Sequence, residues 1–154
     1  MPNPVTVSID VPHSIDAVFD FLDVMANHEP FNDHLMRGWE LSGPDRGIGS
    51  KARVHTKALG VTDVVDIEVI DAERPVRIVE RNTAAKAGRV GQGTYTLRPT
   101  AGGGTHIEFE YRWLIAPVLD RLTAPFVRSY LRRNNATSMR RLAALLSERL
   151  APAR

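Results

Sequence analysis

The sequence contains no cysteine, which excludes disulfide bonds, thiol catalysis and zinc or iron–sulfur sites built on cysteine. Its five histidines show none of the regular spacings of metal ligands, and we find neither a phosphate-binding P-loop nor a Ser–His–Asp arrangement. No apolar run approaches the roughly 18 residues needed to cross a bilayer. We therefore expect no metal site, no cofactor and no stable insertion into a membrane.

Length and composition are typical of one ordinary domain. The chain has 154 residues, 43% of them apolar and 25% charged, which argues against disorder and fibrous repeats. No stretch is long or polar enough to be a linker, so residues 1–154 are predicted to form a single domain. The first residues carry no basic or apolar leader, and we expect a cytoplasmic protein.

Charge is distributed unevenly along the chain, although the formal net charge is only +2. Residues 1–36 contain six acids and no Lys or Arg, whereas residues 117–154 contain eight Arg and only two acids. Such a basic segment could bind nucleic acid or anionic lipid. Alternatively, the acidic and basic segments offset each other within one fold. We favour this alternative because the net charge is small, and we expect no nucleic-acid partner.

Alternating apolar residues predict that most of the chain forms antiparallel strands. Val5, Val7 and Ile9 alternate with polar residues, which is typical of a half-buried strand. Turn residues divide the following region into six further strands, at residues 36–41, 50–58, 61–71, 76–82, 91–98 and 105–115. In the last strand one face is apolar, and we predict that it packs against the final helix: Ile107, Phe109, Tyr111 and Trp113.

Two regions carry a helical pattern. Ser14 is a suitable N-cap for a helix over residues 15–22, where apolar residues recur every three or four positions. We expect residues 27–30 to end this helical region, at most after a second short turn. Near the C-terminus, Pro117 can begin a long final helix, and Pro125 either kinks that helix or marks its true beginning. A leucine-rich stripe follows.

Together these elements predict an α+β helix-grip fold: a curled antiparallel sheet of about seven strands around one long C-terminal helix, with one or two short helices after the first strand. Several local features match a known family as well: the strand–Pro12–helix opening, Asn27 before Phe31, Gly47-Ile48-Gly49, Asp71-Ala72-Glu73-Arg74-Pro75, Gly104-Thr105 and the leucine-rich helix. In these features the chain resembles the START-like (SRPBCC) superfamily, in its polyketide cyclase/dehydrase and lipid-transport branch.

The resemblance implies a cavity between the sheet and the last helix that holds an apolar or amphipathic molecule. Our leading hypothesis is intracellular binding or transport of such a ligand, lipid or polyketide-like. The first alternative is a polyketide aromatase/cyclase or dehydratase on the same scaffold. The second is an interaction or stress-response module without a ligand. The fold does not decide whether the protein is an enzyme. A homodimer is compatible with the sequence.

Two polar residues interrupt the apolar stripe of the final helix. At 100° per residue, Asn135 and Ser138 lie within about 40° of Leu142, at the centre of the stripe. They are candidates for polar contacts with a ligand. In the alternative interpretation, Ser138 bonds back to its own helix and Asn135 bonds a neighbouring strand.

The strands contribute three candidate catalytic residues. If Ile78 points inward, Glu80 does so too, and a buried carboxyl has a raised pKa suited to acid–base catalysis. Alternatively, Glu80 lies near the pocket mouth, solvated or paired with an arginine, which we favour because unpaired Glu is rarely buried. Tyr95 and Tyr111 share the inward register, where each either orients a ligand or packs as a core aromatic.

The predicted ligand cavity lies between the sheet and the helix at residues 126–146. Its wall should be mainly apolar and aromatic, with few polar groups. We predict that it is lined by Phe31, Trp39, Val54, Ile67, Ile78, Tyr95, Phe109, Tyr111, Phe126, Tyr130, Asn135, Ser138 and Met139.

Overall fold

The structure is a computed structural model that describes residues 1–58 and 60–151. Seven strands form one antiparallel sheet in the order β1-β7-β6-β5-β4-β3-β2, which leaves β1 and β2 as its edges. Six consecutive strands therefore pair as hairpin neighbours, and β1 joins beside β7. The strands are β1 (Val5–Val11), β2 (Met36–Ser42), β3 (Lys51–Ala58), β4 (Val61–Glu73), β5 (Arg77–Ala84), β6 (Arg89–Pro99) and β7 (Thr105–Ile115).

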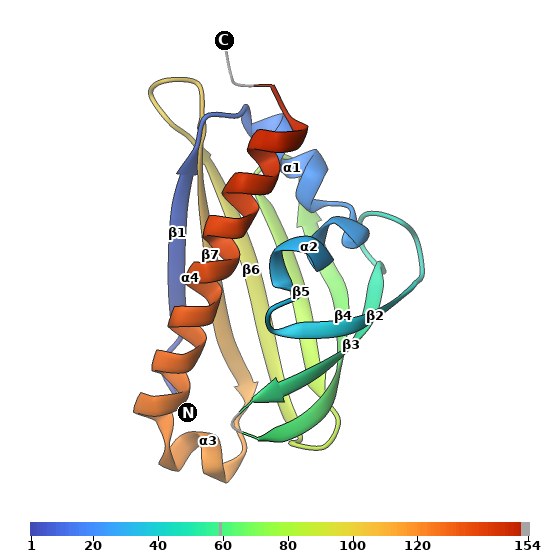
Figure 1. Cartoon of the computed structure of the whole chain (residues 1–154), viewed down its shortest axis with the longest axis vertical. Helices are drawn as coiled ribbons and strands as arrows, with labels where there is room; N and C mark the ends of the chain where they lie inside the picture. The colour runs from blue at the N-terminus through green and yellow to red at the C-terminus, as the bar shows by residue number, and fades with distance from the viewer. Residues whose placement is uncertain (59, 152–154) are drawn as a thin grey trace.

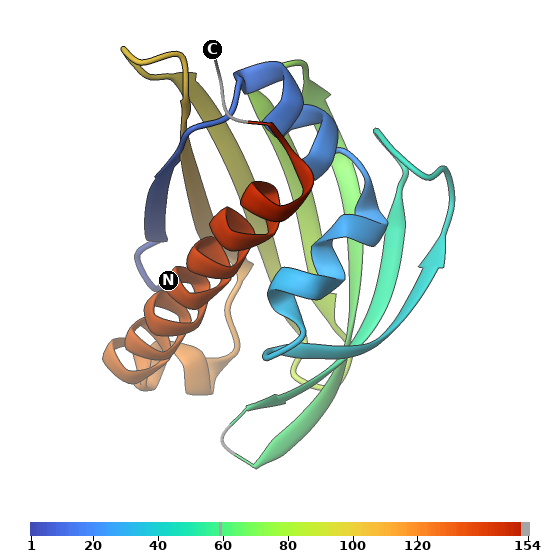
Figure 2. The same ribbon diagram turned by 45° about the horizontal axis from the view of Figure 1, so that its top comes forward.

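The helices lie on one side of this sheet (Figure 1). They are α1 (Ile15–Leu22), the 3₁₀ helix η1 (Met25–His28), α2 (Glu29–Asn32), α3 (Val118–Leu122) and α4 (Ala124–Arg149). The long helix α4 packs against β1 and against α2. Figure 2 shows the sheet curling around α4 and the short N-terminal helices, so the predicted helix-grip fold is confirmed. Within the described residues, no helix has the length and hydropathy of a membrane span.

Two expectations about the helices need correction. Residues 27–30 do not end the first helical region, because η1 and α2 carry it on to Asn32. Pro30 is tolerated there because it occupies the first turn of α2, where a missing N–H breaks no helical hydrogen bond. Pro117 is the N-cap of the short helix α3, and Pro125 lies in the first turn of α4. Of the two alternatives for Pro125, the true beginning of the final helix is correct.

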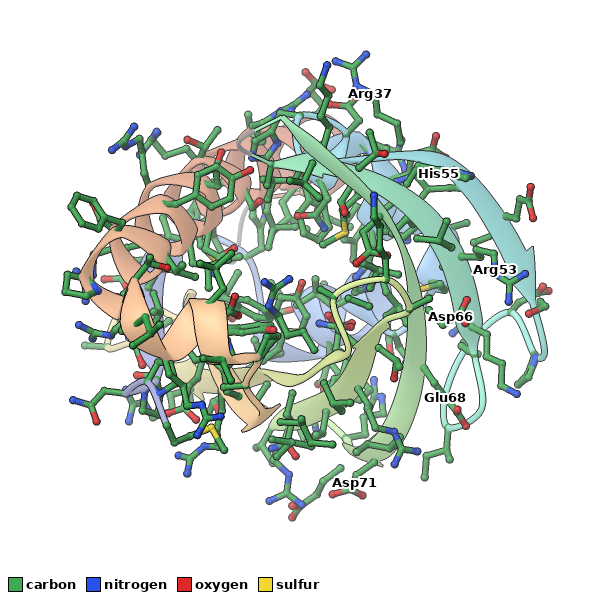
Figure 3. All side chains as sticks on the ribbon, turned by 90° about the horizontal axis from the view of Figure 1, so that it is seen from below. Arg37, Arg53, His55, Asp66, Glu68 and Asp71 are labelled. Atoms are coloured by element: carbon green, nitrogen blue, oxygen red, sulfur yellow. The ribbon has the colours of Figure 1, made fainter. Side chains whose placement is uncertain are left out.

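Side chains of the strands alternate between the outer and the inner face of the sheet. Arg53, Asp66 and Glu68 point away from the interior (Figure 3). Arg53 Nε donates to Asp66 Oδ1 at 2.8 Å across the β3–β4 pair. Because successive strand residues face opposite sides, Val54 and Ile67 point inward, and both are buried.

The apolar face of β7 closes the core from the sheet side. Ile107 and Phe109 belong to the same buried cluster as Leu142 of α4, and Tyr111 is partly buried against it, so this face points into the core. Trp113, at the end of the strand, is buried outside this cluster and reaches α3 instead, where its Nε1–H donates to Asp120 Oδ2 at 2.9 Å.

A buried ion pair fixes α3 to the sheet. The Asp120 side chain accepts hydrogen bonds from Arg89 Nε and Nη2 at 2.5 and 2.6 Å, in addition to the indole of Trp113. Burial alone would raise the pKa of Asp120, but the bonds from Arg89 and Trp113 outweigh it and hold that pKa below its usual range. Asp120 therefore stays charged and orients α3 with its carboxylate toward the sheet.

Two glycines on the inner face of β6 make room for larger neighbours. A Cβ added at Gly91 would collide with the ring of Tyr111, which lies directly over it. A Cβ at Gly93 would come within 3.0 Å of Glu80 Oε1 and of the Phe109 ring. Because these two residues have no side chain, the rings of Tyr111 and Phe109 and the carboxyl of Glu80 lie directly against the backbone of β6.

We predict that Gly91→Ala lowers the free energy of unfolding by about 1–3 kcal/mol, because the Tyr111 ring must leave its position. Gly102→Ala is the matched control, since a Cβ there meets no atom within 4 Å. It should change stability by less than about 0.5 kcal/mol. Urea unfolding of both variants measures the difference. If the two variants lost the same free energy of unfolding, the position of the Tyr111 ring would not require a glycine at residue 91.

Candidate functional site

Polar side chains gather in the interior between the sheet and the helices. We call this group the interior polar cluster: Asn32, Glu80, Asn82, Tyr95, Asn135 and Ser138. Five of them are buried, and Asn32 is half-buried. They come from four elements: α2, the neighbouring strands β5 and β6, and α4. The surrounding residues are apolar or aromatic, so the two ionisable members, Glu80 and Tyr95, lie in surroundings that favour their neutral forms.

Glu80 is the ionisable group at the centre of this arrangement. Its side chain is 6% exposed, and burial raises its pKa from 4.5 to about 7, with partial compensation by a hydrogen bond with Asn82. Among the described residues, Glu80 Oε2 has no hydrogen-bond partner, and no arginine forms a salt bridge with the carboxyl. Near neutral pH, Glu80 is therefore divided between its acid and its carboxylate, which allows it to give or accept a proton.

A hydrogen-bonded chain links α4 to the sheet through α2. Ser138 Oγ donates to Asn32 Oδ1 at 2.8 Å and also lies 3.2 Å from the carbonyl oxygen of Asn134, one helical turn earlier. Asn32 in turn bonds the Tyr95 side chain. Burial, together with the nearby Glu80, raises the pKa of Tyr95 well above its usual range, so its hydroxyl stays protonated. Of the two interpretations of Ser138, the bond to its own helix is present, but its shorter bond crosses to α2.

Three atoms of the cluster are buried without a partner in the described part of the chain: Glu80 Oε2, Asn82 Oδ1 and Asn135 Nδ2. The predicted bond from Asn135 to a strand is therefore not formed by this amide nitrogen. Leaving a buried polar atom unpaired costs about 1–3 kcal/mol. Asn82 Oδ1 and ionised Glu80 Oε2 are acceptors, and Asn135 Nδ2 is a donor. A hydroxyl group can donate to one of the oxygens and accept from Asn135, whereas a carbonyl group can accept from Asn135 or from protonated Glu80.

Aromatic rings gather beside these polar atoms. The ring centroids of Tyr95 and Phe109 are 4.7 Å apart, and that of His28 lies 5.7 Å from Tyr95 and 5.3 Å from Phe31. His28 Nε2 lies 2.7 Å from the carbonyl oxygen of Leu22, and burial lowers its pKa. His28 is therefore neutral, with Nε2–H as the donor, and serves as part of the aromatic wall.

Most of the predicted site residues lie in this interior. Ten are buried: Phe31, Val54, Ile67, Ile78, Glu80, Tyr95, Phe109, Asn135, Ser138 and Met139. Three are half-buried: Trp39, Tyr111 and Tyr130. Trp39 lies on the edge strand β2, where its indole donates to the carbonyl of Met36 at 2.9 Å. Burial raises the pKa of Tyr111 to about 12, so this hydroxyl, like that of Tyr95, acts as a neutral donor or acceptor.

Two expectations about the site are wrong. Phe126 does not face the interior: its side chain is 77% exposed. It precedes Asn135 by nine residues, which places it about 180° away around the helix. Glu80 is neither solvated nor paired with an arginine, contrary to the alternative that we favoured. Its strand neighbours Arg77 and Arg81 point to the outer face, where Arg77 pairs with Asp71.

The sequence reasoning missed Asn82, His28 and Asn32. Asn82 follows Glu80 by two residues on one strand, so the same period of two would have placed it inside. His28 and Phe31 are three residues apart, a helical spacing concealed by the expected break. Asn32 carries no local signal, because only the packing of α2 against α4 brings it to Ser138.

Two surface pockets lie outside this interior. One, of about 430 Å³, is formed by His55, Thr62–Val64 and the turn at Ala85 and Lys86. The other, of about 350 Å³, lies between η1 and the loop from β2 to β3. Neither contains any predicted lining residue, and neither gathers unpaired buried polar atoms as the interior does. The interior polar cluster is therefore the stronger candidate site.

The fold and its polar interior define a helix-grip protein, and the sequence comparison places it in a family. Residues 4–147 match the family described as polyketide cyclase/dehydrase and lipid transport. The chain belongs to this family. No curated protein matches the sequence.

Solved structures share the fold at low sequence identity. TTHA0849 from Thermus thermophilus superposes with a TM-score of 0.72 at 17% identity, covering 96% of this chain and 100% of that one. KanY gives 0.74 at 16% identity, covering 96% and 99%. DynU16, a protein of the dynemicin biosynthetic locus, gives 0.66 at 23% identity; the match covers 100% of this chain but 50% of DynU16. At these identities the similarity establishes the fold alone.

The raised pKa of Glu80 predicts a pH-dependent stability. Unfolded Glu80 ionises near pH 4.5, whereas in the folded protein it ionises near pH 7. The stability gained from the neutral carboxyl is therefore complete below about pH 4.5 and is lost as the pH rises through about 7. Relative to Glu80→Gln, which cannot ionise, the wild type should lose about 3 kcal/mol of unfolding free energy between these limits.

Urea unfolding at several pH values measures this difference. Glu40→Gln, which removes an exposed carboxyl of β2, is the control for the change in net charge. Its difference from the wild type should vary little with pH. A constant difference between Glu80→Gln and the wild type would mean that Glu80 ionises normally in the folded protein.

Proposed function

We propose that this protein binds a hydrophobic or amphipathic small molecule, lipid or polyketide-like, between the sheet and α4, as a single cytoplasmic domain over residues 1–154. The observation that carries the proposal is the set of three buried atoms without partners in the described chain: Glu80 Oε2, Asn82 Oδ1 and Asn135 Nδ2. A ligand hydroxyl would donate to one of the oxygens and accept from Asn135, a ligand carbonyl would accept from Asn135, and the apolar part of the ligand would contact the aromatic wall.

The composition of the wall supports an amphipathic ligand over a strongly charged one. Within the described residues, the interior polar cluster contains no arginine or lysine to pair with an anion, and its one acid, Glu80, is held largely neutral at acidic pH. Arg89, on the same face of the sheet but beside α3, is bound by Asp120. An uncharged polar group on an apolar body matches this combination. Family membership agrees with the proposal, since the family is described by both cyclase chemistry and lipid transport.

We predict that Asn135→Leu weakens ligand binding two- to tenfold, which corresponds to the loss of one buried hydrogen bond worth about 0.5–1.5 kcal/mol. The fold should be retained or stabilised, because the substitution removes a buried amide nitrogen that has no partner in the described residues. The measurement is a titration with an environment-sensitive fluorescent lipid or flavonoid.

Asn134→Leu is the matched control, because Asn134 is the adjacent residue of α4 and its amide bonds its own helix, to the carbonyl of Tyr130 at 2.9 Å. It should bind the probe as the wild type does. Equal affinity of all three proteins would remove Asn135 from the site. If the wild type showed no saturable binding, the carrier function would be refuted and an interaction module without a ligand would be favoured.

A second candidate function, cyclisation or dehydration of a poly-β-keto chain, is favoured by Glu80. In an aldol cyclisation, the Glu80 carboxylate would take a proton from the carbon between two carbonyls. That carbon then bonds to a distant carbonyl carbon, and the resulting alkoxide takes the proton back from Glu80. A pKa of about 7 suits both transfers. Tyr95, whose hydroxyl stays protonated, would polarise the carbonyl.

The enzyme hypothesis predicts that Glu80→Gln lowers turnover of a β-keto substrate about 10²- to 10⁴-fold while probe binding stays within about tenfold of the wild type. The rate of the wild type should also depend on one ionisation near pH 7. Turnover that survives Glu80→Gln would exclude Glu80 as the base. Binding without any turnover by the wild type would favour the carrier over the enzyme.

A further inference from the structure

Helix α3 is oriented with its apolar face outward. Its one carboxylate, Asp120, is 3% exposed, whereas Val118, Leu119 and Leu122 are 61%, 69% and 78% exposed. These three residues share one side of the helix at positions i, i+1 and i+4. An amphipathic helix on a protein surface normally buries its apolar face and exposes its charges.

The inverted orientation is enforced by specific bonds. Arg89 binds the Asp120 carboxylate with two hydrogen bonds, and the Trp113 indole adds a third. Rotating α3 to bury its leucines would break all three bonds. It would also leave the indole N–H of Trp113, a residue that is 3% exposed, without Asp120 as its acceptor. The outward face of α3 is therefore a fixed property of the fold.

The apolar surface extends beyond α3. Of the ten large apolar side chains that are exposed in the described residues, six fall between residues 114 and 126. We call this surface the α3 patch: Leu114, Ile115, Val118, Leu119, Leu122 and Phe126. It joins the end of β7 to the beginning of α4, at one end of the molecule (Figure 1). Concentrated exposure of this kind marks an interaction site rather than scattered surface residues.

The segment that carries the α3 patch, residues 114–133, exposes basic residues and no acid. Arg121, Arg132 and Arg133 are exposed, and none forms a salt bridge within residues 1–58 and 60–151. Between residues 114 and 133 the sole acid is the buried Asp120. The acidic N-terminal segment does not neutralise this end of the molecule. Its one described ion pair with the C-terminal basic segment joins Asp33 to Arg141, further along α4, at 2.6 Å.

We propose that the α3 patch docks this protein reversibly on an anionic lipid surface. An apolar face that enters the interface, flanked by arginines that meet acidic headgroups, is the combination that holds a protein on such a membrane without spanning it. The sequence predicted that the acidic and basic segments offset each other. Arg141 is offset by Asp33 in this way, whereas Arg121, Arg132 and Arg133 remain for acidic headgroups. The proposal is independent of which molecule the interior binds.

A second copy of the chain is the rival occupant. Twofold pairing would place one α3 patch on the other, since an isologous contact uses the same surface on both subunits. Arg121 and Arg133 of the two copies would then meet like charges, with no exposed acid in the patch to separate them. Charge complementarity therefore favours the anionic membrane.

The test is flotation of the full chain with vesicles of phosphatidylcholine alone and of phosphatidylcholine mixed with phosphatidylglycerol. The wild type should bind the mixed vesicles, and binding should fall with added salt. The double variant Leu119→Ser/Leu122→Ser should lose at least about tenfold in partition. The variant Arg132→Gln/Arg133→Gln should lose on the order of tenfold on mixed vesicles and little on neutral ones.

Matched controls remove equal numbers of exposed groups elsewhere. Leu41→Ser/Ile48→Ser replaces two apolar residues that are 53% and 60% exposed, and Arg37→Gln/Arg81→Gln removes two exposed arginines of the sheet. Both should bind as the wild type does. Equal binding of the wild type to both vesicle types, or none to the mixed ones, would overturn the proposal. A dimer that Leu119→Ser/Leu122→Ser dissociates, without vesicle binding, would identify the second copy as the occupant.

Discussion

The alternation of side chains along β5 is the constraint on which the interior depends. Ile78 closes the core against the helices, and a period of two then carries Glu80 and Asn82 to the same face. No register buries Ile78 while leaving the carboxyl in water. The protein therefore keeps an acid in an apolar interior, and the free-energy cost of that position appears as a raised pKa.

The neighbouring strand adapts to this constraint. Gly93 and Gly91 lie opposite Glu80 and Asn82 in the β5–β6 pair. Without side chains, they leave space over the sheet for the carboxyl and for the ring of Tyr111. Glu80 and Asn82 on β5 therefore depend on Gly93 and Gly91 on β6, because the missing side chains leave the space that the polar groups and the aromatic rings fill.

The carboxylate of Asp120, which holds α3 against the sheet, is buried with partners that keep it charged. Glu80 has no basic partner in the described structure and its pKa rises to about 7, whereas Asp120 is bound by Arg89 and Trp113 and stays charged. Both carboxyls are buried, and their neighbours decide the outcome. One arrangement leaves a proton available inside the molecule. The other holds an apolar helix in water at the end of the molecule, between β7 and α4.

Local pattern in the sequence determined the strands and which residues share a face, and it left two alternatives for the beginning of α4. It even contained the position of Phe126, since the helical wheel that turns Asn135 inward turns Phe126 outward. The period of two likewise determined that Glu80 accompanies Ile78. Only the tertiary structure decided that no arginine reaches Glu80 and that Asn32 contacts Ser138. It also decided that Asp120 faces the sheet, so that the apolar face of α3 points outward. These contacts join elements distant in the chain, and no local period encodes which side chains meet across a core.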